Sequence, residues 1–287
     1  RPHTSLSAHV PVRLCRMIPL RDSIPPRTTP IVNHLLILTC VLVYGLQYLD
    51  ERDGRGQIIE QMSMIPARVS HPDVPVTHRE RVRVENSFGF PVQVEREVPL
   101  ENPPFSPAWT LLTCIFLHGG VGHLLGNMWS LWIFGDNVED RLGHVRYLLF
   151  YLVCGVAASA VHLLSDRNSS IPTVGASGAI AGVMGAYLLL YPRATVMTLI
   201  PFGFFSQIIA IPAIYFLLFW FGLQFVSGTL SATGGEAGGV AWWAHVGGFA
   251  AGAAITALFL ALHLTNPKVN TTRPNSQPYR RERYFSG

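Results

Sequence analysis

One serine and four other polar side chains lie in apolar stretches of the chain, where polar groups are rare. Ser177 begins an apolar run that continues to Tyr191. The other four lie in two further apolar runs: His118, His123, Asn127 and His245. A serine hydroxyl becomes a nucleophile when a positioned base removes its proton, and neutral imidazole suits that task near pH 7. The pattern predicts nucleophilic catalysis with Ser177 as the nucleophile and His245 as the base.

The reaction also needs hydrogen-bond donors for a developing oxyanion. His123 and Asn127 are four positions apart, so they share one face of a helix. The free N–H groups at the start of the helix that begins near Ser177 add backbone donors. No Asp or Glu lies in the apolar runs, so we expect a Ser–His dyad without a third, acidic member.

Small residues recur at helical spacing around both reactive residues. Gly178, Gly182 and Ala186 follow Ser177, and Ala244, Gly248 and Gly252 surround His245. Small residues every four positions let membrane helices pack closely. We therefore expect these two helices to meet and to bring imidazole and hydroxyl into hydrogen-bond reach. A packing motif with an incidental serine is the alternative for the serine segment taken by itself.

The composition is that of a polytopic membrane protein. The 287 residues are 49% hydrophobic and only 13% charged, whereas soluble domains carry about 25% charge. Six apolar runs approach the roughly 20 residues needed to cross the hydrocarbon, and they are 31–49, 111–134, 147–164, 174–191, 199–226 and 240–264. The sequence predicts an all-α membrane protein with a six-helix bundle.

The polar segments set the organisation around this bundle. We expect an N-terminal tail (1–30), a six-span domain (31–264) and a C-terminal tail (265–287), with a long first loop (50–108) that contains a β-hairpin around Ser87-Phe88-Gly89. Most Lys and Arg residues fall on the side of both termini, so both termini are expected in the cytoplasm. The reactive groups would then open to the outer face.

Other features exclude functions. The basic residues are spread over loops and tails, so no nucleic-acid partner is expected. The four cysteines lack metal-binding or redox spacing, and three of them, Cys40, Cys114 and Cys154, lie in or beside apolar runs, where Cys acts as a small hydrophobe. No cleavable signal is expected before the first run, and because Met17 is a candidate start, no function is expected of residues 1–16. This start and the acidic inner loops favour a bacterial plasma membrane.

Four segments carry a resemblance: FLHGGVGHLLGN (116–127), EDRLG (139–143), GASG (175–178) and AHVGG (244–248). From about residue 17 to 264, the chain resembles the rhomboid intramembrane serine proteases. The resemblance implies that Ser177 is the nucleophile and His245 the base, with His123 and Asn127 in the oxyanion hole and His118 ordering the outer end of the second span. Gly175 and Gly178, which flank the nucleophile in the GASG segment, are expected to be supporting residues of the site.

The resemblance also implies partners. Rhomboid proteases cleave the transmembrane segments of other membrane proteins within the lipid bilayer, and they need no cofactor or metal. Single-span membrane proteins are thus the expected substrates. The oligomeric state is not given by the sequence.

Three departures from the family pattern stand out. Some relatives carry Trp-Arg in the first loop, where this chain has Trp109-Thr110. Many carry an aromatic residue four positions after the nucleophile, stacked on the histidine, and here that position is Ala181. The first loop is also unusually long.

The fifth predicted span is rich in aromatic residues: Phe202, Phe204, Phe205, Tyr215, Phe216, Phe219, Trp220, Phe221 and Phe225. A lipid-facing helix with interfacial anchors accounts for them. The resemblance offers a second reading, in which spans two and five form a lateral gate for substrate.

Two rival functions stay open. A catalytically inactive relative that binds membrane proteins would usually lack the serine or the histidine, and both are present here. A small transporter or proton channel with a histidine relay is disfavoured because the chain shows no broken-helix pair or clear inverted repeat. Labelling by a fluorophosphonate would separate the protease from both.

Overall fold

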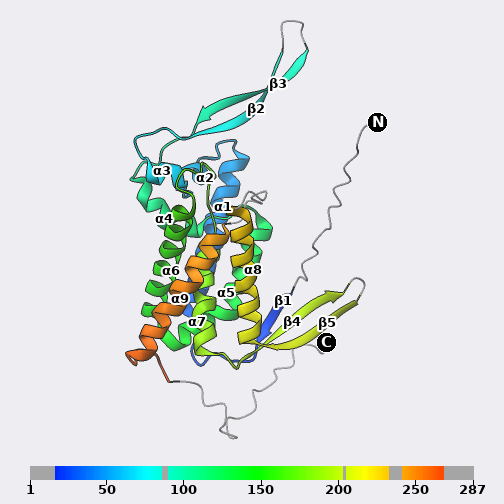
Figure 1. Ribbon diagram of the computed structural model, residues 1–287, viewed down its shortest axis with the longest axis vertical. Coiled ribbons are helices and arrows are strands. Elements are labelled where there is room, and N and C mark those ends of the chain that lie inside the picture. The colour runs from blue at the N-terminus through cyan, green and yellow to red at the C-terminus, as the bar shows by residue number, and fades with distance from the viewer. Residues whose placement is uncertain (1–16, 86–89, 203–204, 233–240, 268–287) are drawn as a thin grey trace, which may run out of the picture.

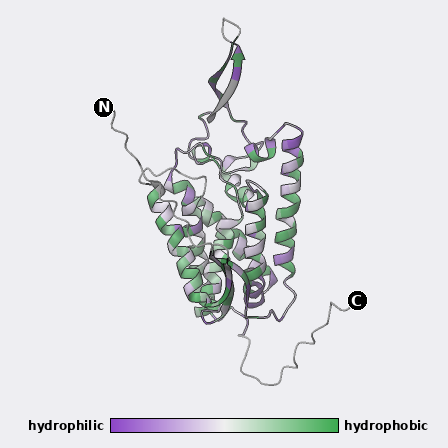
Figure 2. Ribbon diagram, turned by 90° about the vertical axis from the view of Figure 1, so that its right-hand side faces the viewer, coloured by the Kyte–Doolittle hydropathy of each residue, from purple (hydrophilic) through white to green (hydrophobic). Residues whose placement is uncertain are grey.

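The first long helix, α1 (Ile31–Arg52), shows why this chain forms a bundle in a membrane. The computed structural model describes residues 17–85, 90–202, 205–232 and 241–267. One stripe of α1 is apolar and at least half exposed, and it comprises Leu35, Leu38, Leu42 and Leu46. Exposed apolar stripes of this kind suit contact with lipid tails, and Figure 2 shows hydrophobic residues along most of the bundle helices.

The remaining elements follow in chain order. Short helices α2 (Gln57–Met62) and α3 (Pro66–Ser70) precede strands β2 (Thr77–Glu85) and β3 (Pro91–Pro99). Then come η1 (Pro107–Trp109), α4 (Thr110–Thr113), η2 (Cys114–Phe116), α5 (Val121–Leu142), α6 (His144–Ser165) and α7 (Ser177–Leu190). Strands β4 (Thr195–Phe202) and β5 (Phe205–Pro212) lead into α8 (Ala213–Ala232) and α9 (Trp242–Ala261), while strand β1 (Ile18–Asp22) precedes α1.

In the described part of the chain, fewer than six helices qualify as membrane spans by length and composition alone. Within the described residues, α1, α6, α8 and α9 are long and apolar enough to cross a membrane. A fifth span results if the helical turns of residues 107–116 and α5, which meet at a 77° bend, count as one. The fourth predicted span, which carries Ser177, is α7, an apolar helix of 14 residues that is shorter than the other candidate spans.

The predicted hairpin in the first loop is confirmed. Strands β2 and β3 pair antiparallel from Thr77↔Pro99 to Glu85↔Pro91, and the predicted turn at 87–89 lies within residues 86–89, outside the described residues. Figure 1 shows this hairpin projecting from one end of the bundle, which we call the hairpin end. Helices α5, α7 and α9 all begin toward the hairpin end, so residues at their N-termini are brought to similar depth (Figure 1).

The prediction that the fifth span begins at Leu199 was wrong. Residues 195–212 form the β4–β5 hairpin, and β1 adds to it in the order β1-β4-β5. The segment is apolar enough to suggest a span, but its β-branched residues and its prolines at 201 and 212 favour extended backbone. Part of the expected N-terminal tail is therefore a strand, and only residues 1–16 of it lie outside the described residues. The fold is mainly, not wholly, helical.

Helices α7 and α9 pack with almost no space between their backbones. A Cβ on Gly248 would stand 1.9 Å from the carbonyl oxygen of Gly178, and one on Gly252 would stand 2.0 Å from that of Gly182. Only glycine fits at these positions, because any side chain would force the helices apart. The small-residue pattern thus brings the two helices together as predicted.

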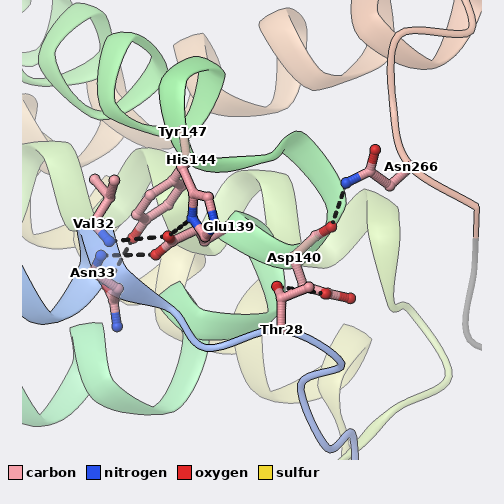
Figure 3. Close-up of polar contacts among 8 residues, drawn as sticks. All are labelled: Thr28, Val32, Asn33, Glu139, Asp140, His144, Tyr147 and Asn266. Atoms are coloured by element: carbon pink, nitrogen blue, oxygen red, sulfur yellow. Dashed lines mark hydrogen bonds and ion pairs between the residues drawn. The ribbon is translucent and has the colours of Figure 1, made fainter.

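A buried acidic cluster on α5 ties the helices together at the end opposite the hairpin. The Glu139 carboxylate is fully buried and accepts hydrogen bonds from the backbone N–H groups of Val32 (3.0 Å) and Asn33 (2.7 Å), and it also contacts His144 Nδ1 (Figure 3). The carboxylate therefore provides hydrogen-bond acceptors for free N–H groups at the start of α1 and a negative charge at the positive end of the helix dipole. The expectation that the second span lacks charged residues holds for 111–134, but α5 extends to Leu142 and carries Asp136, Glu139, Asp140 and Arg141.

The neighbouring Asp140 and Arg141 bind both chain-terminal segments. Asp140 accepts hydrogen bonds from Arg27 Nε (2.8 Å) and Thr28 Oγ1 (3.0 Å). Asn266 Nδ2 donates to the Asp140 carbonyl (2.8 Å), and the Asn266 backbone N–H donates to the Arg141 carbonyl (2.7 Å) (Figure 3). The segments before α1 and after α9 consequently meet at one end of the bundle.

Candidate active site

Ser177 and His245 lie within hydrogen-bond distance at the hairpin end of α7 and α9. The Ser177 hydroxyl donates to His245 Nε2 at 2.8 Å. Both side chains are partly buried, so neither is sealed from solvent. Gly178 directly follows Ser177 on α7, and Gly248 lies three positions after His245 on α9. The close contact between these two glycines fixes the distance between the serine and the histidine. A hydroxyl bonded to an unprotonated imidazole nitrogen is the arrangement that a nucleophile and its base require.

The first turn of α7 presents free backbone donors beside Ser177. The first N–H of α7 that donates to a backbone carbonyl is that of Ile180, which bonds to Ala176 at 2.9 Å. Within the described part of the chain, the N–H groups of residues 177–179 have no backbone acceptor. The positive end of the helix dipole lies at the same place.

His123 reaches the same site from α5, and Gly175 makes room for it. The Gly119 N–H donates to His123 Nδ1 at 3.4 Å, so Nε2 is left to carry the ring proton. A Cβ on Gly175 would stand 2.9 Å from His123 Nε2 and 3.4 Å from Ser177 Oγ. The imidazole donor and the serine hydroxyl therefore flank the same glycine.

Asn127 lies one helical turn after His123 and is 7% exposed. Among the described residues, its amide nitrogen Nδ2 has no hydrogen-bond partner. A buried donor without an acceptor is costly. Such a cost is accepted where a ligand or an intermediate supplies the acceptor, so Asn127 is chemically suited to an oxyanion.

His118 is fully buried and packs edge-on against His123, with ring centroids 5.4 Å apart. Its backbone, rather than its ring, carries the fixed hydrogen bonds. Gln47 of α1 donates from Nε2 to the His118 carbonyl (3.0 Å), and its Oε1 accepts from the His118 N–H (3.1 Å). Gln47 thus holds the turn that leads into α5, and the His118 ring supports His123.

Helix α8 holds the ring of His245, a contact that the sequence did not reveal. His245 Nδ1 donates to Gln224 Oε1 at 2.7 Å, and Trp220 lies against the ring with centroids 5.8 Å apart and planes tilted by 38°. Trp242 meets the ring edge-on at 6.2 Å. Ala181, where many relatives have a stacking aromatic, is buried. The aromatic contacts to His245 thus come from Trp220 on α8 and Trp242 on α9, and not from α7.

At Trp109-Thr110, where some relatives carry Trp-Arg, the two side chains have different environments. Trp109 is 62% exposed, whereas Thr110 is fully buried and donates from Oγ1 to the Pro107 carbonyl at 2.5 Å. Thr110 therefore fixes the turn beneath Trp109 and presents no charge to the surface.

The aromatic residues of α8 divide between two faces. Phe216 and Trp220 face inward, and Phe216 lies 6.3 Å from the ring of Phe134 on α5. Tyr215, Phe219 and Phe225 are between 46% and 68% exposed. The lipid-facing reading accounts for the exposed face, and the inner face contacts α5 and the site. Phe202 and Phe205 belong to the strands, and Phe204 lies outside the described residues.

A cavity of about 500 Å³ lies away from these groups. It opens between the segment 20–26, Met197 and the α5 residues Trp132, Ile133 and Asp136. This places it toward the end opposite the hairpin (Figure 1). It contains none of the residues that surround Ser177.

Gln224 and Gln47 could have been found from the sequence by the rule that identified the histidines. Each is an isolated polar residue within an apolar run, and polar residues at membrane depth mark functional or structural sites. What the sequence could not give is their partners, His245 and His118, which lie 21 and 71 positions away.

Comparison with known proteins places the chain among related sequences. A Rhomboid domain matches residues 106–262, more than half of the chain. RHOMBOID-like protein 5 of Arabidopsis thaliana is 42% identical over 80 residues, 28% of this chain and 26% of that protein. Rhomboid protease GluP of Bacillus subtilis is 46% identical over 80 residues, 28% of this chain and 15% of that protein. Putative rhomboid protease YdcA of the same organism is 39% identical over 82 residues, 29% of this chain and 41% of that protein. The matched segment spans less than half of each of these relatives.

Proposed function

The chain belongs to the rhomboid family, and on this premise we propose that it is an intramembrane serine endopeptidase that uses Ser177 and His245. Family membership and relatives named as proteases support intramembrane proteolysis. The observation that carries the assignment to these residues is the 2.8 Å hydrogen bond from Ser177 Oγ to His245 Nε2.

The proposed reaction begins when Ser177 Oγ attacks the carbonyl carbon of a peptide bond while its proton passes to His245 Nε2. The resulting oxyanion accepts hydrogen bonds from Asn127 Nδ2, His123 and the free N–H groups at the start of α7. The proton on Nε2 then passes to the leaving amine, and an acyl-enzyme remains on Ser177. Water, deprotonated by the same nitrogen, hydrolyses the ester and restores the hydroxyl.

Water access is supported by the length of α7. A helix of 14 residues is about 21 Å long, whereas the hydrocarbon core is roughly 30 Å thick. Ser177 is the first residue of this short helix and is partly buried, so in this proposal it lies below the outer membrane surface. A shortened helix below a polar cluster provides room for water from the hairpin end.

The proposed substrates are single-span membrane proteins, which enter from the lipid. The proposed location is the plasma membrane of a bacterium, with both termini in the cytoplasm and the hairpin end outside. Contacts of Arg27 and Asn266 with the same residue, Asp140, support placing residues 1–30 and 265–287 on one side of the domain formed by 31–264.

Labelling of detergent-solubilised protein with a fluorophosphonate tests the proposal. We expect labelling of the wild type, and none of Ser177→Ala or His245→Ala variants that elute as folded monodisperse protein. Cleavage of a model transmembrane substrate in proteoliposomes should follow the same pattern. Absence of both activities in folded wild type would point to an inactive binding relative, and cleavage by Ser177→Ala would end the serine-protease assignment.

A further inference from the structure

We propose that Gln224 is a positioning residue that sets the protonation and orientation of His245, and that α8 thereby controls the base carried by α9. This inference rests on the proposed function. It concerns a residue of α8 that does not touch Ser177, so it acts on the reaction only through His245.

The hydrogen-bond pattern of the ring carries the first step. Gln224 Oε1 can only accept, so His245 Nδ1 must carry a proton to make the 2.7 Å bond. The neutral imidazole has one ring proton, and its other nitrogen, Nε2, is then free to accept from Ser177. Gln224 thus selects the tautomer in which the nitrogen facing the serine is basic.

The environment favours an amide over a carboxylate in this role. Gln224 is 8% exposed, and α7, α8 and α9 contain no Asp or Glu in their described ranges. A buried carboxylate would cost far more to desolvate than a neutral amide. The amide oxygen orients the imidazole without adding a charge to the apolar segment.

Trp220 strengthens the link between α8 and His245. Residues 220 and 224 are four positions apart and therefore lie on one face of α8. The Trp220 ring lies beside the imidazole in a tilted arrangement, with centroids 5.8 Å apart, while Gln224 binds Nδ1 at the ring edge. Since Ala181 on α7 offers only a methyl group, the aromatic contact to this ring comes from Trp220 on α8 and Trp242 on α9. Seating of α8 against α9 is then a condition for a competent base.

Three substitutions of Gln224 separate the effect of its hydrogen-bond acceptor from the effect of its packing. Gln224→Met and Gln224→Leu fill similar space without an amide oxygen, and Gln224→Glu keeps an oxygen at the same position. Thr229→Val is the matched control, because Thr229 Oγ1 donates to the Phe225 carbonyl of its own helix and its side chain is exposed. The readouts are kcat and KM for a model transmembrane substrate and the rate of fluorophosphonate labelling.

We expect Gln224→Met and Gln224→Leu to lower kcat and the labelling rate by about 10- to 100-fold, the range found for hydrogen-bond partners that orient metal-binding histidines, with KM changed less than about twofold. Gln224→Glu should recover part of the lost rate, because burial favours its neutral carboxyl form, whose carbonyl oxygen can still accept from His245 Nδ1. Thr229→Val should match wild type. Wild-type rates in both apolar variants, or equal losses in Gln224→Glu and Gln224→Met, would overturn the inference. If the wild type itself shows no Ser177-dependent labelling, the proposed function fails first, and that outcome is distinct from a labelled wild type with indifferent Gln224 variants.

Discussion

Gly175 lies so close to His123 that a Cβ on the glycine would stand 2.8 Å from the imidazole Cε1. The backbone of Gly175 also has φ of +134°, which side chains of L-residues rarely adopt. Conformation and contact both demand glycine immediately before the turn that carries Ser177. The position of the His123 imidazole, a proposed oxyanion donor, therefore depends on a residue with no side chain.

Gly175→Ala should accordingly displace His123 and lower kcat by about 10²-fold, the effect of losing one oxyanion donor. The measurement is cleavage of a model transmembrane substrate, with the thermal midpoint recorded beside it. Gly45→Ala, at a position with open space around it on α1, is the control and should keep wild-type kcat. An active Gly175→Ala enzyme would show that His123 does not need its present place.

Asn127→Ala should leave measurable activity. One oxyanion donor is worth about 10²–10³ in rate, and the other proposed donors remain. We expect kcat to fall within that range with little change in KM, measured in proteoliposomes. An equal change in the exposed Asn168 should have no effect, and complete loss of labelling in Asn127→Ala would assign the asparagine a different role.

Glu139→Gln should destabilise the protein without altering the site directly. The substitution removes the charge that faces the first N–H groups of α1, and charge-assisted hydrogen bonds of this kind contribute about 2 kcal/mol each. Thermal unfolding in detergent should show a midpoint several degrees lower than in wild type. Glu51→Gln, which removes the same charge from an exposed position of α1, should change the midpoint little, and equal midpoints for both variants would refute the capping role.

Asp22 should make stability depend on pH. Burial raises the pKa of its carboxyl from 3.8 to about 6, although Tyr187 and Asn137 donate hydrogen bonds to it. Because the folded state binds this proton more tightly than the unfolded chain, the contribution is complete below about pH 4 and is lost as pH rises through about 6.

The Asp22→Asn variant should therefore gain thermal stability relative to wild type as pH increases from 4 to 7. Thermal midpoints of both proteins across this range measure the difference. Asp73→Asn, at an exposed position, should run parallel to wild type. A constant difference between Asp22→Asn and wild type would show that Asp22 does not titrate in this range.

Hydrophobic runs, alternation of polar and apolar residues and the spacing of small residues predicted several helices, one hairpin and one helix contact correctly. The first, third and sixth apolar runs became α1, α6 and α9, and the alternation around residue 87 became β2 and β3. The small residues after Ser177 predicted the contact of α7 with α9, because close approach of helices requires them. The pairing of Ser177 with His245 follows from that contact.

The features that the sequence did not reveal depend on distant partners. The run from Leu199 to Pro212 is apolar in either conformation, and its strands are stabilised by pairing with each other and with β1. Glu139 reads as a loop residue until the start of α1 surrounds it, about 106 positions away. Gln224 has no local signal for His245. Hydropathy describes the free energy of transferring a side chain from water to an apolar phase. It does not identify the distant group that will form a hydrogen bond with a buried polar side chain.

The pairing of β1 with β4 has a consequence for biosynthesis. Ile18 of β1 pairs with Leu199 of β4. Strand β1 is therefore synthesised about 180 residues before the strand with which it pairs. At about 5–20 residues per second, that interval is about 10 to 40 s. During this time β1 has an unpaired edge, which other strands could join. The sheet can close only after α7 has left the ribosome, so the segment before the first helix is among the last parts of the protein to reach its place.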